Sequence, residues 1–438
     1  MKWFRSSCAA LVVMGLLEPA QAHDLLQRYR DALEHDAQFL AARALSQAGE
    51  EDALLRLAGL LPSLSLDAQS NWSQAQYETL GGRLEQRRQS RSYSVQLRQP
   101  VFRWQSWVQY QQGQQQQAFS RLQLGIAAQA LMLRVAKTYF DVLTASEVLN
   151  VLSRLRKVDA EQLAGAKKQF ELGNVSIVDV HEAQASFDLV SARIIGARSK
   201  LDLARHELSR VTGSPVDELR GLSDGVDMVL PQPIDAEAWV KSAERNSLEV
   251  QAQEVLLEIA RNEIQSRKAE HLPTLDLVAS KSLQQNPNTG TERGATDTIV
   301  LRMSMPLYAG GGASASVRKA KTLAAKAEYE LEDARRAASS LARAAWAGVV
   351  DGVGQVRALE AAKISAESAL AANRLGYKVG VRTGRDVLEM QAQYSEMLQR
   401  LSSARYDTLL AKLRLKAAVG ALSEEDLVEL NVFLSAPV

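Results

Sequence analysis

Two stretches of the sequence, 101–214 and 307–436, contain no proline. Proline normally recurs in the loops of globular domains, so stretches of this length without it are unusual. Because proline breaks the interior of a helix, long helical segments are the simplest structure that fits both stretches. We therefore expect long helices to dominate the chain, although its 438 residues would allow two or three compact domains.

The first 22 residues have the features of a secretory signal peptide. Lys2 and Arg5 precede an uncharged apolar run at 6–17, which is too short to cross a membrane, and an A-x-A pattern follows at 20–22. Cleavage after this pattern would remove the only cysteine, Cys8, and bring the formal net charge from +1 to 0. We therefore expect an exported chain without thiol chemistry. The balanced charge gives no support for a nucleic-acid partner.

The remaining chain carries one pattern twice. A Leu-Pro motif at 61–66 recurs at 272–277, and a Pro-hydrophobic-aromatic motif at 100–102 recurs at 306–308. Four further positions recur at an offset of 207: Phe170, Gly173, Asp179 and Val180 correspond to Tyr377, Gly380, Asp386 and Val387. The matches keep their order, which indicates a tandem duplication.

The duplication divides the chain into a first repeat at 23–213 and a second at 236–420. The segment 214–235 between them contains prolines, glycines and acids and is typical of a linker. Residues 421–438 then form a C-terminal segment.

Each repeat has the same predicted order of elements. A helical segment precedes the Leu-Pro motif and two short strands, and a long helix, a glycine turn and a third helix follow. The predicted helices are 24–60, 104–172 and 177–212 in the first repeat and 236–271, 313–379 and 383–419 in the second. The long helix would measure about 100 Å, roughly the summed length of the two shorter ones. We therefore expect the short helices to stack end to end alongside the long one.

Apolar residues in the long helices recur at alternating steps of four and three, as in a coiled coil. The series are Leu124, Ala128, Leu131, Val135, Thr138, Val142, Ala145, Leu149 and Leu152, and Ala324, Ala327, Leu331, Ala334, Ala338, Leu341 and Ala345. The alanines of the second series would let neighbouring helices approach closely. An ordinary antiparallel bundle has the same periodicity, so the pattern leaves both arrangements open.

Four segments alternate between apolar or small residues and polar ones; they lie at 64–72, 93–101, 274–280 and 299–307. This alternation over about ten residues is typical of strands in a membrane barrel with a wet interior, and also fits surface hairpins on a soluble bundle. Four strands cannot close a barrel, and an open sheet edge is not stable in lipid. If the strands span a membrane, several chains must therefore share one barrel: two chains supply eight strands and three supply twelve.

Several short motifs are more specific than these periodic patterns. They are His271-Leu272-Pro273-Thr274-Leu275-Asp276-Leu277, Pro306-Leu307-Tyr308 with Gly310-Gly311, Gly376-Tyr377, Val379-Gly380 with Arg382-Thr383, Asp386-Val387-Leu388, and the close of the chain from Leu422 to Val438. Together they resemble the TolC family of outer-membrane channel proteins, and the resemblance covers the whole mature chain.

The resemblance implies a mainly α fold with a membrane β-barrel. Long coiled-coil helices would form a periplasmic α-barrel, and four strands per chain would contribute to a shared 12-stranded outer-membrane barrel in a homotrimer. The linker and the C-terminal segment would pack around the middle of the helices. The implied location is the outer membrane of a Gram-negative bacterium, in contact with outer-membrane lipid and extending into the periplasm.

The implied function is that of a passive exit duct in a tripartite export system. Its partners would be a periplasmic adaptor protein and an inner-membrane transporter, either an ABC transporter or a proton-driven one. The same architecture serves type I protein secretion and multidrug efflux, and we expect secretion. A non-pore periplasmic coiled-coil adaptor is the alternative from another class, but it would carry its helical hairpin once.

The family's closed helix tips imply a gate at three matching residues, Asp179, Tyr377 and Arg382. Gln162 matches a family glutamine, whereas Arg374 replaces the glutamate that usually partners it. The second gate contact is therefore expected to differ or to be absent.

Two further carboxylates, Asp386 and Glu389, match the family's acidic rings in the lumen, with glutamate in place of the usual second aspartate. Their spacing of three, with Gln393 four residues further on, puts all three on one helix face. Three chains would place six carboxylates around a narrow throat, which would attract cations.

Four prolines are expected where strands turn into or out of helices: Pro62, Pro100, Pro273 and Pro306. No residues at recognisable spacing form a nucleophile with its base, a histidine ligand pair or a phosphate-binding loop. We therefore expect neither an enzyme nor a cofactor or metal site.

Overall fold

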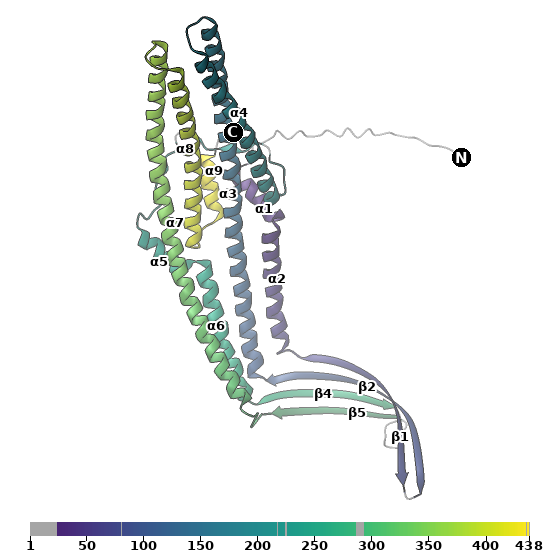
Figure 1. Cartoon of the computed structure of the whole chain (residues 1–438). Helices are drawn as coiled ribbons and strands as arrows, with labels where there is room; N and C mark the ends of the chain where they lie inside the picture. Colours follow the sequence, from purple (N-terminus) through teal and green to yellow (C-terminus); the bar gives the residue numbers. More distant parts are fainter. Residues whose placement is uncertain are drawn as a thin grey trace, which may run out of the picture.

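The computed structural model describes residues 24–79, 81–216, 218–223, 226–285, 293–434 and 436–437. The predicted signal peptide lies outside these residues. Two very long helices run along most of the molecule: α3 spans Trp104–Glu171 and α7 spans Gly312–Lys378 (Figure 1). Each boundary lies within one residue of its predicted position. Within the described residues, no helix combines the length and apolar character needed to cross a bilayer.

The shorter helices flank the long ones in two sets. Helix α4 (Ile177–Thr212) and the pair α1 (Leu25–His35) and α2 (Ala37–Ala58) follow one another along α3. Helix α8 (Gly384–Ala418) and the pair α5 (Ala236–Asn246) and α6 (Leu248–Lys268) do so along α7 (Figure 1). The predicted end-to-end stacking of short helices beside a long one is therefore confirmed.

The first helical segment of each repeat is broken, whereas the sequence predicted it to be continuous. In the first repeat the break falls at Asp36, whose Oδ1 accepts a hydrogen bond of 2.8 Å from the Phe39 N–H and so caps α2. The end of α4 meets this break, because a Cβ atom on Gly213 would collide with the ring of His35. We call this meeting point the first joint.

The second repeat has an equivalent break at Ser247, between α5 and α6. The end of α8 meets it, because a Cβ atom on Gly420 would collide with the carbonyl oxygen of Asn246. Gly213 and Gly420 both have positive φ angles, 74° and 71°, that glycine adopts without strain. We call this meeting point the second joint. Each break thus gives the neighbouring helix room to end.

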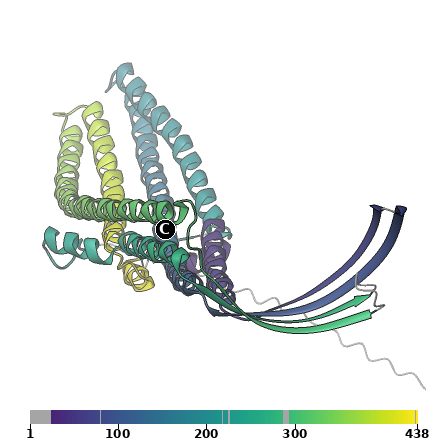
Figure 2. The ribbon, with the colours of Figure 1, turned by 90° about the horizontal axis from the view of Figure 1, so that it is seen from below.

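The strands form one antiparallel sheet in the order β1-β2-β4-β5. Strands β1 (Ser63–Thr79) and β2 (Gly82–Phe102) are longer than β4 (Thr274–Gln285) and β5 (Arg293–Ser304). The sheet is strongly curved and projects from one end of the helices (Figure 2). Strands β1 and β5 are its two edges, so a single chain leaves the sheet open on both sides.

Three of the four predicted turn prolines lie between a strand and a helix. Pro62 precedes β1, Pro273 lies between a short 3₁₀ helix, Ala269–His271, and β4, and Pro306 lies between β5 and α7. The fourth, Pro100, is an error of prediction, because β2 continues through it to Phe102. The pairing of β2 with β4 is irregular at this point, and the pairing with β1 stops at Ser63 and Arg98. The missing backbone N–H of the proline is therefore tolerated.

The largest core lies at the middle of the helices, where the chain's outer segments join them. Strand β3 (Arg220–Gly221) of the linker pairs with β6 (Ala436–Pro437), and α9 (Glu424–Phe433) packs against α1. The buried Tyr139 hydroxyl donates to the Arg220 carbonyl over 2.8 Å, and the Tyr406 hydroxyl donates to Glu147 over 2.7 Å. These bonds connect the linker to α3 and α3 to α8.

Candidate functional site

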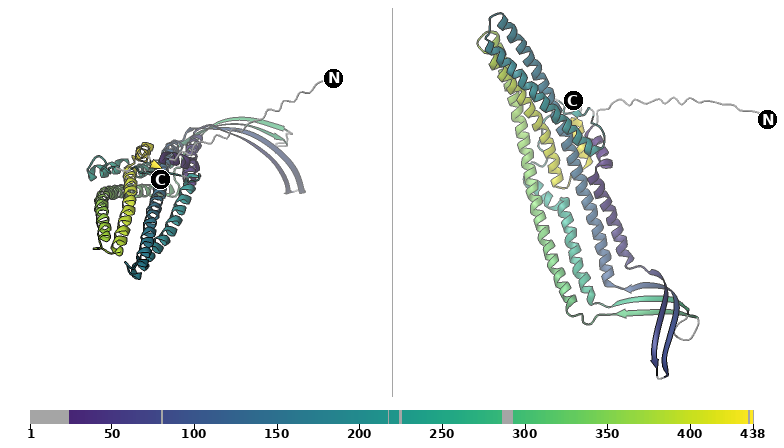
Figure 3. Two further views of the ribbon diagram at one scale, coloured as in Figure 1. Left: turned by 90° about the horizontal axis from the view of Figure 1, so that it is seen from above. Right: turned by 45° about the vertical axis from the view of Figure 1, so that its right-hand side comes forward.

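Most of the predicted site residues lie at the helical tip, the end of the molecule opposite the sheet. Here α3 turns into α4 and α7 turns into α8, and the two hairpins lie close together (Figure 3). Gly173 and Gly380 take positive φ angles of 75° and 82° in these turns. After each glycine a backbone N–H reaches back to the preceding helix: Asn174 to Gln169 and Val381 to Gly376, both over 2.9 Å. The two tip turns therefore have the same construction.

A capping box closes each turn at the start of the next helix. The Ser176 N–H donates to Asp179 Oδ2 over 2.8 Å, and the Thr383 N–H donates to Asp386 Oδ2 over 2.9 Å. Asp179 and Asp386 are thus equivalent residues of the two repeats, although the resemblance assigns them to different features. Hydrogen bonds from Thr383 hold the pKa of Asp386 below its usual value, which keeps this carboxylate ionised.

Tyr377 and Arg382 lie together at the turn between α7 and α8. The Arg382 side chain covers Gly376, where a Cβ atom would come within 2.7 Å of its Cγ, and the Tyr377 ring lies 3.7 Å from the Cβ position of Gly384. Asp179 belongs to the other hairpin of the same chain. The fold therefore brings two of the three predicted gate residues into one turn and presents the third on the neighbouring tip.

Arg374 has a partner that the sequence did not indicate. Its guanidinium donates to the side-chain oxygen of Gln391 over 2.5 Å, and Gln391 is buried between α7 and α8. Arg374 therefore connects the two helices of one hairpin. Gln162 lies half-buried on α3.

The sequence also did not predict two contacts between the hairpins. Leu388 of α8 packs against a small apolar cluster formed by Leu163, Val180 and Ala183 on α3 and α4. Nearby, Arg385 and Glu182 form an ion pair of 3.7 Å across the same boundary. Heptad periodicity identifies the apolar face of each helix but not which hairpin it meets, so only the fold reveals these contacts.

The predicted acidic face of α8 is present. Asp386 and Glu389 lie one turn apart, and Gln393 Nε2 donates to Glu389 Oε1 over 3.5 Å, which confirms that Glu389 and Gln393 share a face. Glu389 and Gln393 are exposed in the single chain. Within the described parts of the chain, no group of three or more His, Cys, Asp or Glu side chains is arranged to hold a metal ion.

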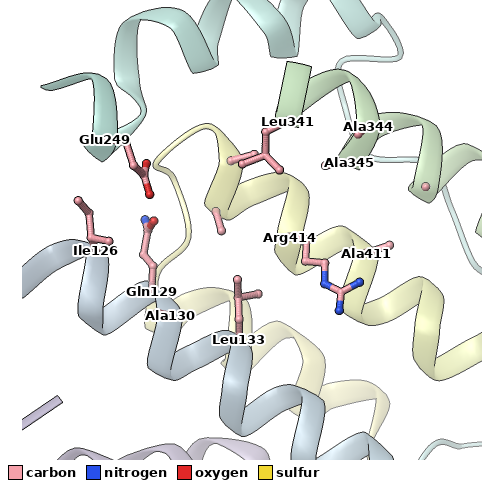
Figure 4. A pocket seen from close by; sticks show the side chains of 13 residues that line it. Ile126, Gln129, Ala130, Leu133, Glu249, Leu341, Ala344, Ala345, Ala411 and Arg414 are labelled. Atoms are coloured by element: carbon pink, nitrogen blue, oxygen red, sulfur yellow. The ribbon is translucent and has the colours of Figure 1, made fainter. Parts of the chain in front are cut away.

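A cavity of about 420 Å³ lies at the second joint, between α3, α6, α7 and α8. Its walls are mostly alanine and aliphatic side chains. Figure 4 shows Glu249 of α6 facing Gln129 of α3 at one side, with Arg414 of α8 beside Ala411 at another. The cavity lies where α8 has ended and α6 has just begun, so it occupies the interruption in the stacked helices.

Comparison with known proteins identifies the family. The family model described as outer membrane efflux protein matches residues 28–214 and 239–421. The chain is 31% identical over 441 residues to the outer membrane protein TolC of Escherichia coli (strain K12), covering 98% of this chain and 88% of that protein. It is 33% identical over 421 residues to the alkaline protease secretion protein AprF of Pseudomonas aeruginosa, covering 94% and 87%.

Solved structures of such channels share the fold. The CmeC outer membrane channel of Campylobacter jejuni superimposes with a TM-score of 0.80 at 14% identity, over 93% of this chain and 88% of that one. The outer membrane protein VceC of Vibrio cholerae superimposes with a TM-score of 0.77 at 15% identity, over 90% of this chain and 96% of that one. These matches agree with the predicted combination of helical and strand barrels. The chain belongs to the outer membrane efflux protein family, and it is a channel protein of the Gram-negative outer membrane that extends into the periplasm, not an enzyme.

Proposed function

We propose that three copies of the chain form the passive exit duct of a type I protein secretion system. The observation that supports the assembly is the curved sheet, which is open at β1 and at β5. In lipid these edges need partners, and the edge strands of neighbouring copies supply them. Three copies give a barrel of twelve strands, continued by the long helices.

Protein secretion is favoured by the names of two relatives that match nearly the whole chain. They are the alkaline protease secretion protein of Pseudomonas aeruginosa, at 33% identity, and the proteases secretion protein of Dickeya chrysanthemi, at 30%. Multidrug efflux is the second candidate, since the outer membrane efflux protein BepC of Brucella suis is 26% identical over 68% of this chain. In either case an inner-membrane transporter and a periplasmic adaptor complete the export system.

Deletion of the gene distinguishes the two functions. For secretion, we expect the deletion strain to retain a protein substrate inside the cell and to keep its drug tolerance, with plasmid-borne protein restoring export. Unchanged protein export with increased sensitivity to drugs or detergents would contradict the proposal and favour efflux.

We also propose that the helical tip is the gate, with Asp179, Tyr377 and Arg382 joining adjacent tips and with Asp386 and Glu389 lining the throat. Tyr377 and Arg382 share one turn, and Asp179 lies on the other hairpin, an arrangement that suits contacts between hairpins. Tyr377→Phe combined with Arg382→Ser should raise single-channel conductance in planar bilayers. Unchanged conductance would refute this assignment.

The throat carboxylates are tested by Asp386→Asn combined with Glu389→Gln, which should weaken cation selectivity. Asparagine at 386 can still accept the capping hydrogen bond from Thr383, so the turn is kept while the charge is removed. Asp188→Asn is the control, because it removes an exposed carboxylate of α4 that belongs to neither the proposed gate nor the proposed throat. Equal selectivity in the double variant and the control would contradict a throat role.

A further inference from the structure

The outer face of the curved sheet carries an organised pattern of side chains. Along β2, residues at odd positions from 87 to 97 are exposed, and those at even positions from 88 to 96 are partly covered. This difference is expected for the convex and concave surfaces of a curved sheet. The pairing register extends the convex face over all four strands, so its side chains fall into rows that cross the sheet.

The rows nearest the helices are mainly apolar, with one lysine–aspartate pair among them. Leu64, Leu97, Ala279 and Ile299 form one such row, and Ala68, Tyr93, Leu283 and Ala295 form the last one. From Leu275 to Leu283 this band extends about 26 Å along the strand, or about 20 Å in height at a tilt of about 40°. That is close to the apolar band of about 25 Å on outer-membrane barrels, so the next row lies at the hydrocarbon boundary.

The next row consists of Ser70, Arg91, Gln285 and Arg293, and we call it the arginine row. It contains two guanidinium groups and no carboxylate. Arg91 and Arg293 lie two strands apart, which corresponds to about 10 Å. Tyr93 stands one row nearer the helices and Trp72 one row further, and Trp72 is 79% exposed. Tyrosine and tryptophan are typical of the membrane interface, so they place the arginine row at the level of lipid headgroups.

Charges within the apolar band are arranged differently. Lys281 lies on the same convex face, two rows nearer the helices than the arginine row, and pairs with Asp297 across β4 and β5 at 3.5 Å. A basic side chain that faces hydrocarbon is thus matched with a carboxylate, as expected where unpaired charge is costly. The arginine row contains no carboxylate that could match its two guanidinium groups in the same way.

We propose that the arginine row binds the phosphate groups of the glycolipid that forms the outer leaflet of the Gram-negative outer membrane. The row lies toward the β1–β2 turn, the end of the sheet away from the periplasmic helices, and therefore faces the outer leaflet (Figure 1). Arginine binds phosphate through parallel N–H donors, and two arginines about 10 Å apart can hold the two phosphates of one headgroup. This inference rests on the proposed function only in that the convex face of the assembled barrel meets lipid.

The experiment uses the purified full-length protein in detergent and native mass spectrometry with three probes: diphosphoryl lipid A, dephosphorylated lipid A and phosphatidylglycerol. We expect the wild-type protein to prefer diphosphoryl lipid A. Arg91→Gln combined with Arg293→Gln should weaken that binding about twenty-five-fold, at about fivefold for each arginine near the membrane surface. The matched control is Arg88→Gln combined with Arg98→Gln, which removes the same charge from the concave face and should leave binding unchanged.

Equal binding of the phosphorylated and dephosphorylated forms by the wild-type protein would overturn the proposal, as would equal binding of phosphatidylglycerol. Full binding by the convex-face variant would also overturn it. Channel conductance of the same variants is measured in parallel and should be retained. Loss of conductance in the wild-type protein with intact lipid binding would count against the proposed channel assembly and not against the arginine row.

Discussion

The two joints share the same backbone geometry, but different side chains pack around them. At both, a glycine with positive φ ends one helix against a break in the next. The first joint holds an ion pair between Arg134 and the buried Asp36 at 2.9 Å. At the matching positions of the second joint the chain has Leu341 and Ser247, and an alanine-lined cavity lies there. The duplicated unit therefore requires the glycine and the break, and it tolerates very different packing around them.

The largest expected effect tests the shared backbone. Gly420→Ala forces alanine into the left-handed region and drives its Cβ into the Asn246 carbonyl, which cannot move without shifting a helix end. We expect the free energy of unfolding to fall by about 3 kcal/mol or more. Gly213→Ala has the same backbone strain, but the exposed His35 side chain can move to another χ1 rotamer, so we expect a loss of about 1–2 kcal/mol in folding free energy. Thermal unfolding followed by circular dichroism should rank the two variants in this order; equal melting temperatures would contradict the comparison.

The second prediction tests the different side chains at the two joints. Arg134→Ala leaves the carboxylate of Asp36 buried without its cation and should cost about 2 kcal/mol. Leu341→Ala, at the matching position of the second joint, removes an exposed side chain and should cost less than about 0.5 kcal/mol. The melting temperatures of the two variants provide the measurement. A larger loss for Leu341→Ala would mean that the cavity wall supports the joint more than the ion pair does.

A third prediction extends the comparison to the hairpins. Asp159 of α3 is buried, its Oδ2 accepts a 2.8 Å hydrogen bond from Ser186, and the second repeat has Ala366 at this position. Burial raises the pKa of Asp159, so the folded chain holds this proton more tightly than the unfolded chain does. Stability therefore falls as the pH rises from the unfolded value, about 3.9, through the raised one.

Asp159→Asn removes this pH-dependent penalty while keeping an acceptor for Ser186. We expect it to stabilise the protein by about 1 kcal/mol at neutral pH and by less as the pH falls toward about 4. Melting temperatures between these pH values measure the change. Asp188→Asn alters an exposed carboxylate of α4 and should show no such trend. A pH-independent gain for Asp159→Asn would exclude the burial penalty as its cause.

The smallest expected effect concerns the cavity side of α7. Gly348 lines the cavity, and a Cβ atom there would meet nothing within 4 Å. Gly348→Ala should therefore stabilise the helix by about 0.5–1 kcal/mol. Gly352→Ala, one turn later, would bring its Cβ within 2.7 Å of the Thr408 hydroxyl and should destabilise. The same sign for both substitutions would show that local space does not decide the outcome.

The helix boundaries could be predicted from the sequence because their signals are local. Glycines follow α3 and α7, and Ser176 and Thr383 begin capping boxes, so the predicted ends agree to within one residue. The breaks at Asp36 and Ser247 have no proline or glycine. They arise because α4 and α8 end against them, which is a tertiary cause that a periodic pattern does not contain.

The strands and the site show the same limit. The outer half of β2, 82–92, is polar apart from Leu84 and Gly82 and shows no alternation, so the sequence predicted only the half that begins at Tyr93. The site residues came from family motifs, and their local surroundings came from the fold. Gln391 beside Arg374, and Glu182 beside Arg385, lie on neighbouring helices whose rotation about their own axes the sequence does not fix.

The two capping boxes at the tip have a mechanical consequence. Each turn is held by a glycine with positive φ, by a backbone hydrogen bond to the preceding helix and by an aspartate that binds the N–H three residues before it. Turns held by these hydrogen bonds are short and rigid and resist local unfolding. Any widening of this end of the molecule must therefore come from the movement of whole hairpins. The pivot of that movement lies far from the tip, at the joints where the helices are packed.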